Sequence, residues 1–215
     1  MTKYSNNTAM MKKLFLIFLA FSFSNIFGQL KTDLNINFKL RGDKYVQTSI
    51  KDTTALGGFA KSDNLPKKYV DSLNSSEVGL ILKIDINKST SFENKYNGYK
   101  LYLINKTNNT VGLDASDSRL DIVGEVFYKG KWQAIEYLPS STCGNSYHTV
   151  FLKQNEFWEF DIPKFNGKIN TKLRYKLTID KSNLYSNEIP TLINKNQMLK
   201  IKKYDQNGLM DPYNE

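Results

Sequence analysis

Residues 78–87 read VGLILKIDIN, and this stretch decides the fold class. Every second side chain from Val78 to Ile86 is apolar, and most of those between are glycine or polar. Residues 173–179, LRYKLTI, alternate in the same way. A period of two sustained over this length predicts half-buried β-strands with one apolar and one mostly solvated face.

Shorter runs rich in β-branched and aromatic residues extend this pattern along the chain. The pair Lys129-Gly130 separates two of them and predicts a compact hairpin turn. Trp158, Phe160 and Ile162 alternate like a buried face. The further strands predicted are Lys100–Asn105, Arg119–Tyr128, Lys131–Tyr137, Thr149–Leu152, Phe157–Ile162 and Gln197–Lys202.

Strands of this length, separated by Asn, Gly, Ser and Asp clusters, predict an all-β protein. We expect an antiparallel immunoglobulin-like β-sandwich over residues 78–203, with a barrel as the alternative. Residues 29–77 are less regular and form an N-terminal extension with room for one or two edge strands. Residues 204–215 are expected to be a loose tail.

The first 28 residues predict export. Lys12 and Lys13 precede the apolar run Leu14–Phe23, and the segment closes on small or polar residues ending at Gly28. That order is typical of a cleaved secretory signal peptide, and the run is shorter than the roughly twenty residues of a membrane-spanning helix. We therefore expect a periplasmic, cell-surface or extracellular protein with no stable membrane insertion after cleavage.

The charge of the mature chain excludes some partners. Removing residues 1–28 takes away three lysines and no acid, so 30 basic residues fall to 27 against 21 acidic ones, a net charge of +6. The charges are dispersed, which is typical of a soluble surface. No nucleic-acid, phosphate-binding or cofactor motif occurs, so we expect neither a nucleic-acid partner nor a cofactor.

The stretch SSTCGNSYH, residues 140–148, holds the only cysteine and the only histidine. A nucleophilic thiol needs a base, and Cys143 with His148 is the sole possible pair. The segment matches no protease signature, so we interpret Cys143, Gly144 and Asn145 as a structural loop. In this interpretation Gly144 and Asn145 adopt positive φ and Cys143 is a small buried hydrophobe. A thiol that pairs with another chain remains an alternative.

Metal chemistry and enzymatic activity are not expected. One cysteine and one histidine are too few ligands to form a zinc site. Asp114, Asp117 and Asp121 could form a calcium loop, but they lack the spacing of a recognised one, and a solvated hairpin loop is the preferred interpretation. No nucleophilic serine elbow occurs either. We predict a non-enzymatic protein without metal or catalytic residues.

Aromatic residues make up 13% of the chain, and they are the candidates for binding. Trp132 follows a predicted hairpin turn, which favours exposure. Tyr137 and Tyr147 are the other binding candidates. Exposed aromatics anchor protein partners or stack on sugars.

Several blocks carry a resemblance: GKWQAIEY at 130–137, CGNSY at 143–147, NTKLR at 170–174, YSN at 185–187 and INKNQ at 193–197. In combination they resemble uncharacterised exported proteins of Bacteroidota, over about residues 98–202. The resemblance implies a shared structural framework that includes the CGNSY loop, and it implies no functional residue.

The sequence therefore predicts an exported binding protein. The first hypothesis is a protein–protein interaction module with an unidentified envelope partner. The alternative is a carbohydrate-binding module that uses exposed aromatics such as Trp132.

Overall fold

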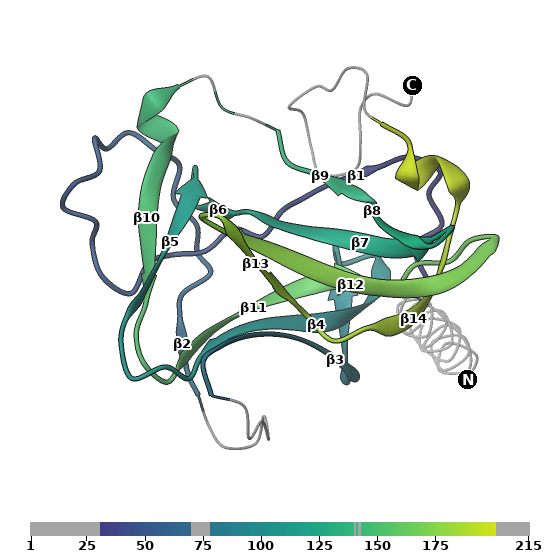
Figure 1. The fold of residues 1–215 in the computed structure, drawn as a ribbon, viewed down its shortest axis with the longest axis horizontal. Coiled ribbons are helices and arrows are strands. Elements are labelled where there is room, and N and C mark those ends of the chain that lie inside the picture. The colour runs from purple at the N-terminus through teal and green to yellow at the C-terminus, as the bar shows by residue number, and fades with distance from the viewer. Residues whose placement is uncertain (1–30, 70–77, 140, 142, 201–215) are drawn as a thin grey trace, which may run out of the picture. The chain divides into compact units, whose positions relative to one another are not determined.

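The computed structural model describes residues 31–69, 78–139, 141 and 143–200. Residues from Asp33 onward belong to one compact unit, separate from Met1–Thr32. The predicted signal peptide and tail lie outside the described residues. Strands dominate this unit (Figure 1): β1 Leu40–Arg41, β2 Lys67–Lys68, β3 Leu80–Phe92, β4 Tyr96–Asn105, β5 Val111–Ser116, β6 Arg119–Leu120, β7 Ile122–Tyr128, β8 Lys131–Ala134, β9 Glu136–Tyr137, β10 Tyr147–Leu152, β11 Glu156–Pro163, β12 Ile169–Ile179, β13 Ser182–Tyr185 and β14 Ile189–Ile193.

The strands form two larger sheets and two smaller ones. The first larger sheet has the order β2-β11-β4-β3, and the second has the order β13-β12-β7-β8, with β14 also paired to β12. A third sheet has the order β10-β5-β6. All these pairs are antiparallel, whereas β1 and β9 pair in parallel. The all-β prediction is confirmed.

The main core joins the inner faces of the two larger sheets. Trp158, Phe160 and Ile162 are buried on β11, and Leu173, Tyr175 and Leu177 are buried on β12, as their alternation predicts. All six belong to one hydrophobic cluster. Burying such side chains is the dominant favourable contribution to folding.

The stretch at 78–87 departs from its simple alternation. Leu82 and Ile84 face the core as predicted, but Val78 and Ile86 are exposed near the ends of the run. Ile81, which the alternation assigns to the solvated face, is buried in a second apolar cluster with Tyr102, Ile104 and Phe157, against which Tyr69 packs. The outer face of this sheet is therefore partly covered.

The predicted hairpin turn is confirmed. Phe127 pairs with Trp132 and Tyr128 with Lys131, which leaves Lys129 and Gly130 as the two turn residues. Both have positive φ, 52° and 79°. This is the geometry of a type I′ turn, whose twist matches that of the flanking strands.

Three of the predicted strands differ from the elements found in the structure. The run Arg119–Tyr128 divides at Asp121, and the run Lys131–Tyr137 divides at Ile135. Gln197 and Met198 belong to a 3₁₀ turn, Lys195–Met198, rather than to a strand. The Asn194 N–H donates to the Gln197 side chain, and this local capping competes with extended structure.

The segment before β3 contributes to the main core. Leu34, Ile36, Leu40 and Val46 are buried in it. β1 pairs with β9, and β2 pairs with the edge of β11. Across the described part of the chain, none of the helices has the length and hydrophobicity needed to cross a bilayer.

Candidate functional site

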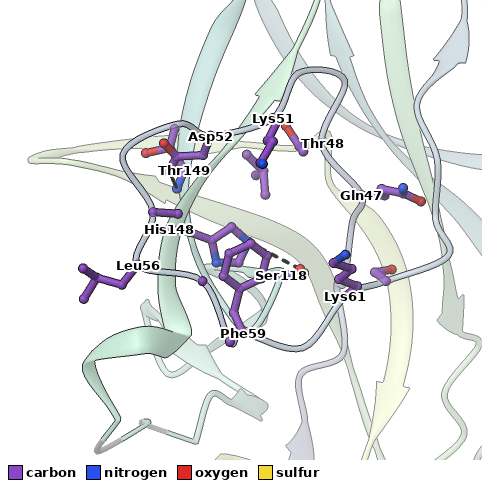
Figure 2. Close-up of a pocket in the computed structure, with 15 residues that line it drawn as sticks. Gln47, Thr48, Lys51, Asp52, Leu56, Phe59, Lys61, Ser118, His148 and Thr149 are labelled. Atoms are coloured by element: carbon purple, nitrogen blue, oxygen red, sulfur yellow. Dashed lines mark hydrogen bonds between the residues drawn. The ribbon is translucent and has the colours of Figure 1, made fainter.

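A cavity of about 630 Å³ lies beneath residues 47–62, named here the 47–62 loop. The loop contains no strand and encircles side chains that come from β10 and from the turn between β5 and β6 (Figure 2). The lining residues are Gln47, Thr48, Lys51, Asp52, Ala55, Leu56, Gly57, Gly58, Phe59, Lys61, Ser62, Ser118, His148, Thr149 and Val150.

The first half of the loop is tied to the edge strand β10. The Phe151 N–H donates to the Thr48 hydroxyl at 2.8 Å, and the Ser49 N–H donates to the Phe151 carbonyl at 2.8 Å. The Asp52 carboxylate accepts the Thr149 N–H at 2.9 Å. The loop thus satisfies backbone groups that an edge strand otherwise leaves open.

The second half is held at Ala60 by the turn between β5 and β6. The Ala60 N–H donates to the Asp117 carboxylate at 3.1 Å, and the Ser118 hydroxyl donates to the Ala60 carbonyl at 2.7 Å. Asp117 and Ser118 both have positive φ in this turn. Both backbone groups of Ala60 are therefore fixed to the sheet.

His148 forms the floor of the cavity. Its ring stacks on Phe59 with centroids 3.6 Å apart and planes 10° from parallel. Its Nδ1 lies 3.1 Å from the Ser146 carbonyl, and its Nε2 lies 3.4 Å from the Ser118 hydroxyl (Figure 2). Both ring nitrogens thus face protein oxygens, which fixes the orientation of the ring.

Ser118 and His148 are not arranged as a nucleophile and its base. The Ser118 hydroxyl donates its one hydrogen to the Ala60 carbonyl at 2.7 Å, so it has none to give to His148. Ser118 is also buried. The pair has the geometry of a structural contact.

The charges around the cavity are unequal. Lys51 and Lys61 are exposed at its rim and have no ion-pair or hydrogen-bond partner among the described residues. Asp52 is the one carboxylate among the described lining residues. Hydrogen bonds from the Thr149 N–H and from Thr54 lower the pKa of Asp52 to about 2. Asp52 is thus ionised and held by the loop and β10, and the two lysines outnumber it among the described lining residues.

A second candidate surface lies on the outer face of the sheet formed by β7, β8, β12 and β13. The Arg174 guanidinium lies 4.0 Å from the Trp132 ring centroid and 3.9 Å from that of Tyr185, between the two aromatics. It also donates to Glu125 Oε2 at 3.0 and 3.1 Å. Stacking of this kind is worth about 0.5–1 kcal/mol at exposed sites and about 2 kcal/mol or more where the groups are desolvated, and the Arg174 side chain is only 17% exposed.

The three aromatics proposed from sequence lie on three different sheets. Trp132 is half-buried on β8 against Arg174. Tyr137 is buried on β9. Tyr147 is exposed on β10, and its hydroxyl donates to the Ser141 carbonyl at 3.0 Å. They do not form one site.

The Cys143 loop departs from the predicted conformation. Cys143 is exposed rather than buried. Gly144 and Asn145 belong to a 3₁₀ turn, Gly144–Ser146, and neither has positive φ. Tyr147 does begin the next strand, as predicted. The two ring nitrogens of His148 face Ser146 and Ser118, so the imidazole is not directed to the thiol.

A buried polar cluster lies in the core beneath β7. Lys44 Nζ lies 3.8 Å from Glu136 Oε1, and it also bonds to Asp43. The Glu136 carboxylate accepts the Tyr175 hydroxyl at 3.1 Å and the Gly124 N–H at 3.0 Å. Burial raises the pKa of Glu136, which Lys44 only partly offsets. Burial, followed by Glu136, raises the pKa of Tyr175 well above its ordinary value.

The remaining acidic candidates do not converge. Asp117 lies in the turn after β5, and Asp114 is exposed on β5 itself. Within the described ranges, no group of three or more His, Cys, Asp or Glu side chains is placed to hold a metal ion.

The cavity residues Lys51, Phe59 and Lys61 were not identified from sequence. One available signal is the length of the stretch without strand pattern around Gly57-Gly58, because long irregular loops in compact domains are often functional. No family model, curated protein sequence or solved structure matches the chain.

Proposed function

We propose that this chain is an exported, non-enzymatic binding protein built on an immunoglobulin-like β-sandwich. It recognises a protein partner through the outer face of the β13-β12-β7-β8 sheet. Two larger antiparallel sheets that share one core support the sandwich assignment. Residues 1–28 have the charged, apolar and small-residue order of a signal peptide, which supports export. The resemblance to exported Bacteroidota proteins supports a place in the envelope of such an organism.

The observation that carries this proposal is the position of Arg174 between Trp132 and Tyr185. Trp, Tyr and Arg are the residue types that dominate binding energy at protein interfaces. Here all three meet on one sheet face. The Glu125 carboxylate holds the guanidinium in place, so little side-chain entropy is lost when a partner docks.

Exposed apolar side chains continue this surface. Phe127, Tyr185 and Leu192 are 42%, 43% and 40% exposed, and all three lie on the outer face by their strand register. Lys172, Arg174 and Lys176 alternate along β12 on the same face. Each of these basic side chains already pairs with Glu188 or Glu125, so the chemistry fits a partner that places an apolar patch on the exposed aromatics and Leu192.

Carbohydrate binding remains the second candidate, on the strength of Trp132. One face of its ring is occupied by Arg174, however, and its neighbour Phe127 meets it edge-on at 5.4 Å. A sugar needs a free aromatic face. The arrangement therefore favours a protein partner.

Site-specific photo-crosslinking in envelope extracts tests this proposal. Mature protein with Phe127→p-benzoylphenylalanine is expected to give one reproducible adduct with a protein. The matched control is Tyr147→p-benzoylphenylalanine, because Tyr147 is at least as exposed, 53% against 42%, but lies on another sheet. Equal adducts from both positions, or polysaccharide enriched instead of protein, would overturn the proposal.

The second test measures the affinity of variants for the captured partner. Tyr185→Ala is expected to weaken binding at least about tenfold, as truncation of an interface anchor does. Tyr147→Ala is the matched exposed tyrosine and is expected to leave the affinity unchanged.

A further inference from the structure

We propose that the cavity beneath the 47–62 loop is a binding site for a small organic anion, with an apolar body and a carboxylate. This inference goes beyond docking of a protein partner and rests on a different part of the molecule. The site is formed by the loop, by β10 and by the turn before β6 (Figure 2).

The size and lining of the cavity fit a small molecule. Its volume of about 630 Å³ lies within the roughly 300–1,000 Å³ of ligand pockets. Ala55, Leu56, Phe59 and Val150 are apolar lining residues. The side chain of Leu56 is 79% exposed and points away from the cavity, so Phe59, Ala55 and Val150 remain as the apolar surface for a ligand body (Figure 2).

The charge of the ligand follows from the two lysines at the rim. Several lysines of the larger sheets are ion-paired, as with Lys100 to Asp161 at 2.7 Å and Lys172 to Glu188 at 2.9 Å, whereas others, such as Lys168 and Lys181, have no ion pair among the described residues. Lys51 and Lys61 also have no such partner among the described residues, but what distinguishes them is that they line one cavity. A ligand carboxylate in the cavity would form a charge-assisted pair with either lysine.

The one acidic side chain in the described lining does not oppose this. Asp52 accepts the Thr149 N–H and both donors of Thr54, which direct its carboxylate to the loop backbone and β10. It holds the loop in place rather than occupying the lysines. It keeps its negative charge, and the two lysines outnumber it among the described lining residues. The net charge of the described lining is therefore positive.

The site is also largely preformed. Phe59 is stacked on His148, and the ring of His148 is held by the hydrogen bond from its Nδ1 to the Ser146 carbonyl. The loop is anchored to β10 and at Ala60, so little of it must be ordered on binding. Gly57, with φ of +79° and open space around it, leaves the tip able to adjust.

Titration of the mature protein with 1-naphthoate tests the proposal, with its neutral counterpart 1-naphthamide as the matched ligand. Calorimetry is expected to show saturable 1:1 binding of naphthoate, at least tenfold tighter than that of naphthamide. Amide NMR shifts are expected at residues 47–62 and at 148–150. No saturable naphthoate binding up to millimolar concentration, or shifts confined to other segments, would overturn it.

Charge variants distinguish binding at this site from non-specific binding of naphthoate to a basic protein. Lys51→Met/Lys61→Met is expected to weaken naphthoate at least tenfold and to leave naphthamide unchanged. The control Lys168→Met/Lys181→Met removes two exposed lysines outside the cavity and is expected to change neither. Equal naphthoate affinity in both double variants refutes the assignment. Tyr185→Ala leaves naphthoate binding intact, so this test is independent of the protein-docking proposal.

Discussion

The carboxylate of Asp52 accepts the backbone N–H of Thr149 at 2.9 Å, across 97 residues of chain. Together with the bonds of Thr48 and Ser49 to Phe151, this contact holds the 47–62 loop against the edge of β10. It also couples the stability of the loop to pH, because the three hydrogen bonds require the ionised form.

The first prediction concerns acid stability. The pKa of Asp52 is lowered from 3.8 to about 2, so its contribution is present above pH 4 and is lost as pH falls through 2. Asp52→Asn is expected to be less stable than wild type at pH 6. The difference in unfolding free energy is expected to shrink towards zero by pH 2. Urea unfolding between pH 2 and 7 measures this, and a pH-independent difference would contradict it.

The second prediction concerns the buried pair of Lys44 and Glu136. Glu136→Gln leaves Lys44 with Asp43 as its one carboxylate partner. It is expected to lower the free energy of unfolding by about 3 kcal/mol. The double variant Lys44→Met/Glu136→Gln is expected to cost at least about 1 kcal/mol less than the sum of the single changes. Chemical denaturation of the four proteins measures the coupling.

The exposed pair of Lys172 and Glu188 provides the matched control for that cycle. Its coupling is expected to lie within about 0.2–1 kcal/mol, because solvent screens both charges. A coupling for the buried pair no larger than this would show that the core cluster is not energetically linked.

The third prediction concerns Cys143. Its exposed thiol is expected to react completely with iodoacetamide in the folded protein. His148→Asn is expected to leave the rate unchanged, because the imidazole bonds to the Ser146 carbonyl and its other nitrogen faces Ser118, not the thiol. Mass spectrometry of timed samples measures the reaction. A rate that falls tenfold in the variant would revive the rejected dyad.

The fourth prediction compares two glycines. Gly130 has φ of +79° with open space around it, so Gly130→Ala is expected to cost about 1–2 kcal/mol through its backbone alone. At Gly167 an added Cβ would lie 2.2 Å from the Ile193 carbonyl carbon. Gly167→Ala must displace backbone and is expected to cost more than about 3 kcal/mol. Thermal unfolding ranks the two, and the reverse order would be inconsistent with this geometry.

Strands and turns whose sequence signal lies within a few residues were predicted correctly. The alternation through Leu173 and Tyr175 sufficed for β12, and Lys129-Gly130 sufficed for the turn between β7 and β8, because both signals lie within a few residues. The burial of Ile81 was not predictable in this way. It depends on Phe157 and Tyr102 from neighbouring strands, which supply a second apolar cluster.

The candidate sites were predicted only in part. Trp132 was identified from its place after a turn, but its partners Arg174 and Tyr185 come from later strands. The cavity was missed because Phe59, Ser118 and His148 meet only in the folded chain. The burial expected for Cys143 was wrong, since the 3₁₀ turn directs a short loop outward where a positive-φ turn was expected.

The pairing of early with late segments has a consequence for the order of folding. Gln47 accepts the Trp158 indole N–H across 111 residues, and Asn35 bonds to Asn194 across 159. Synthesis delivers residues 34–62 well before partners such as Trp158 and Asn194. Until then Leu34, Leu40 and Val46 have no core to enter. Such non-local closure makes folding slow and leaves a nascent apolar segment in need of a holdase chaperone.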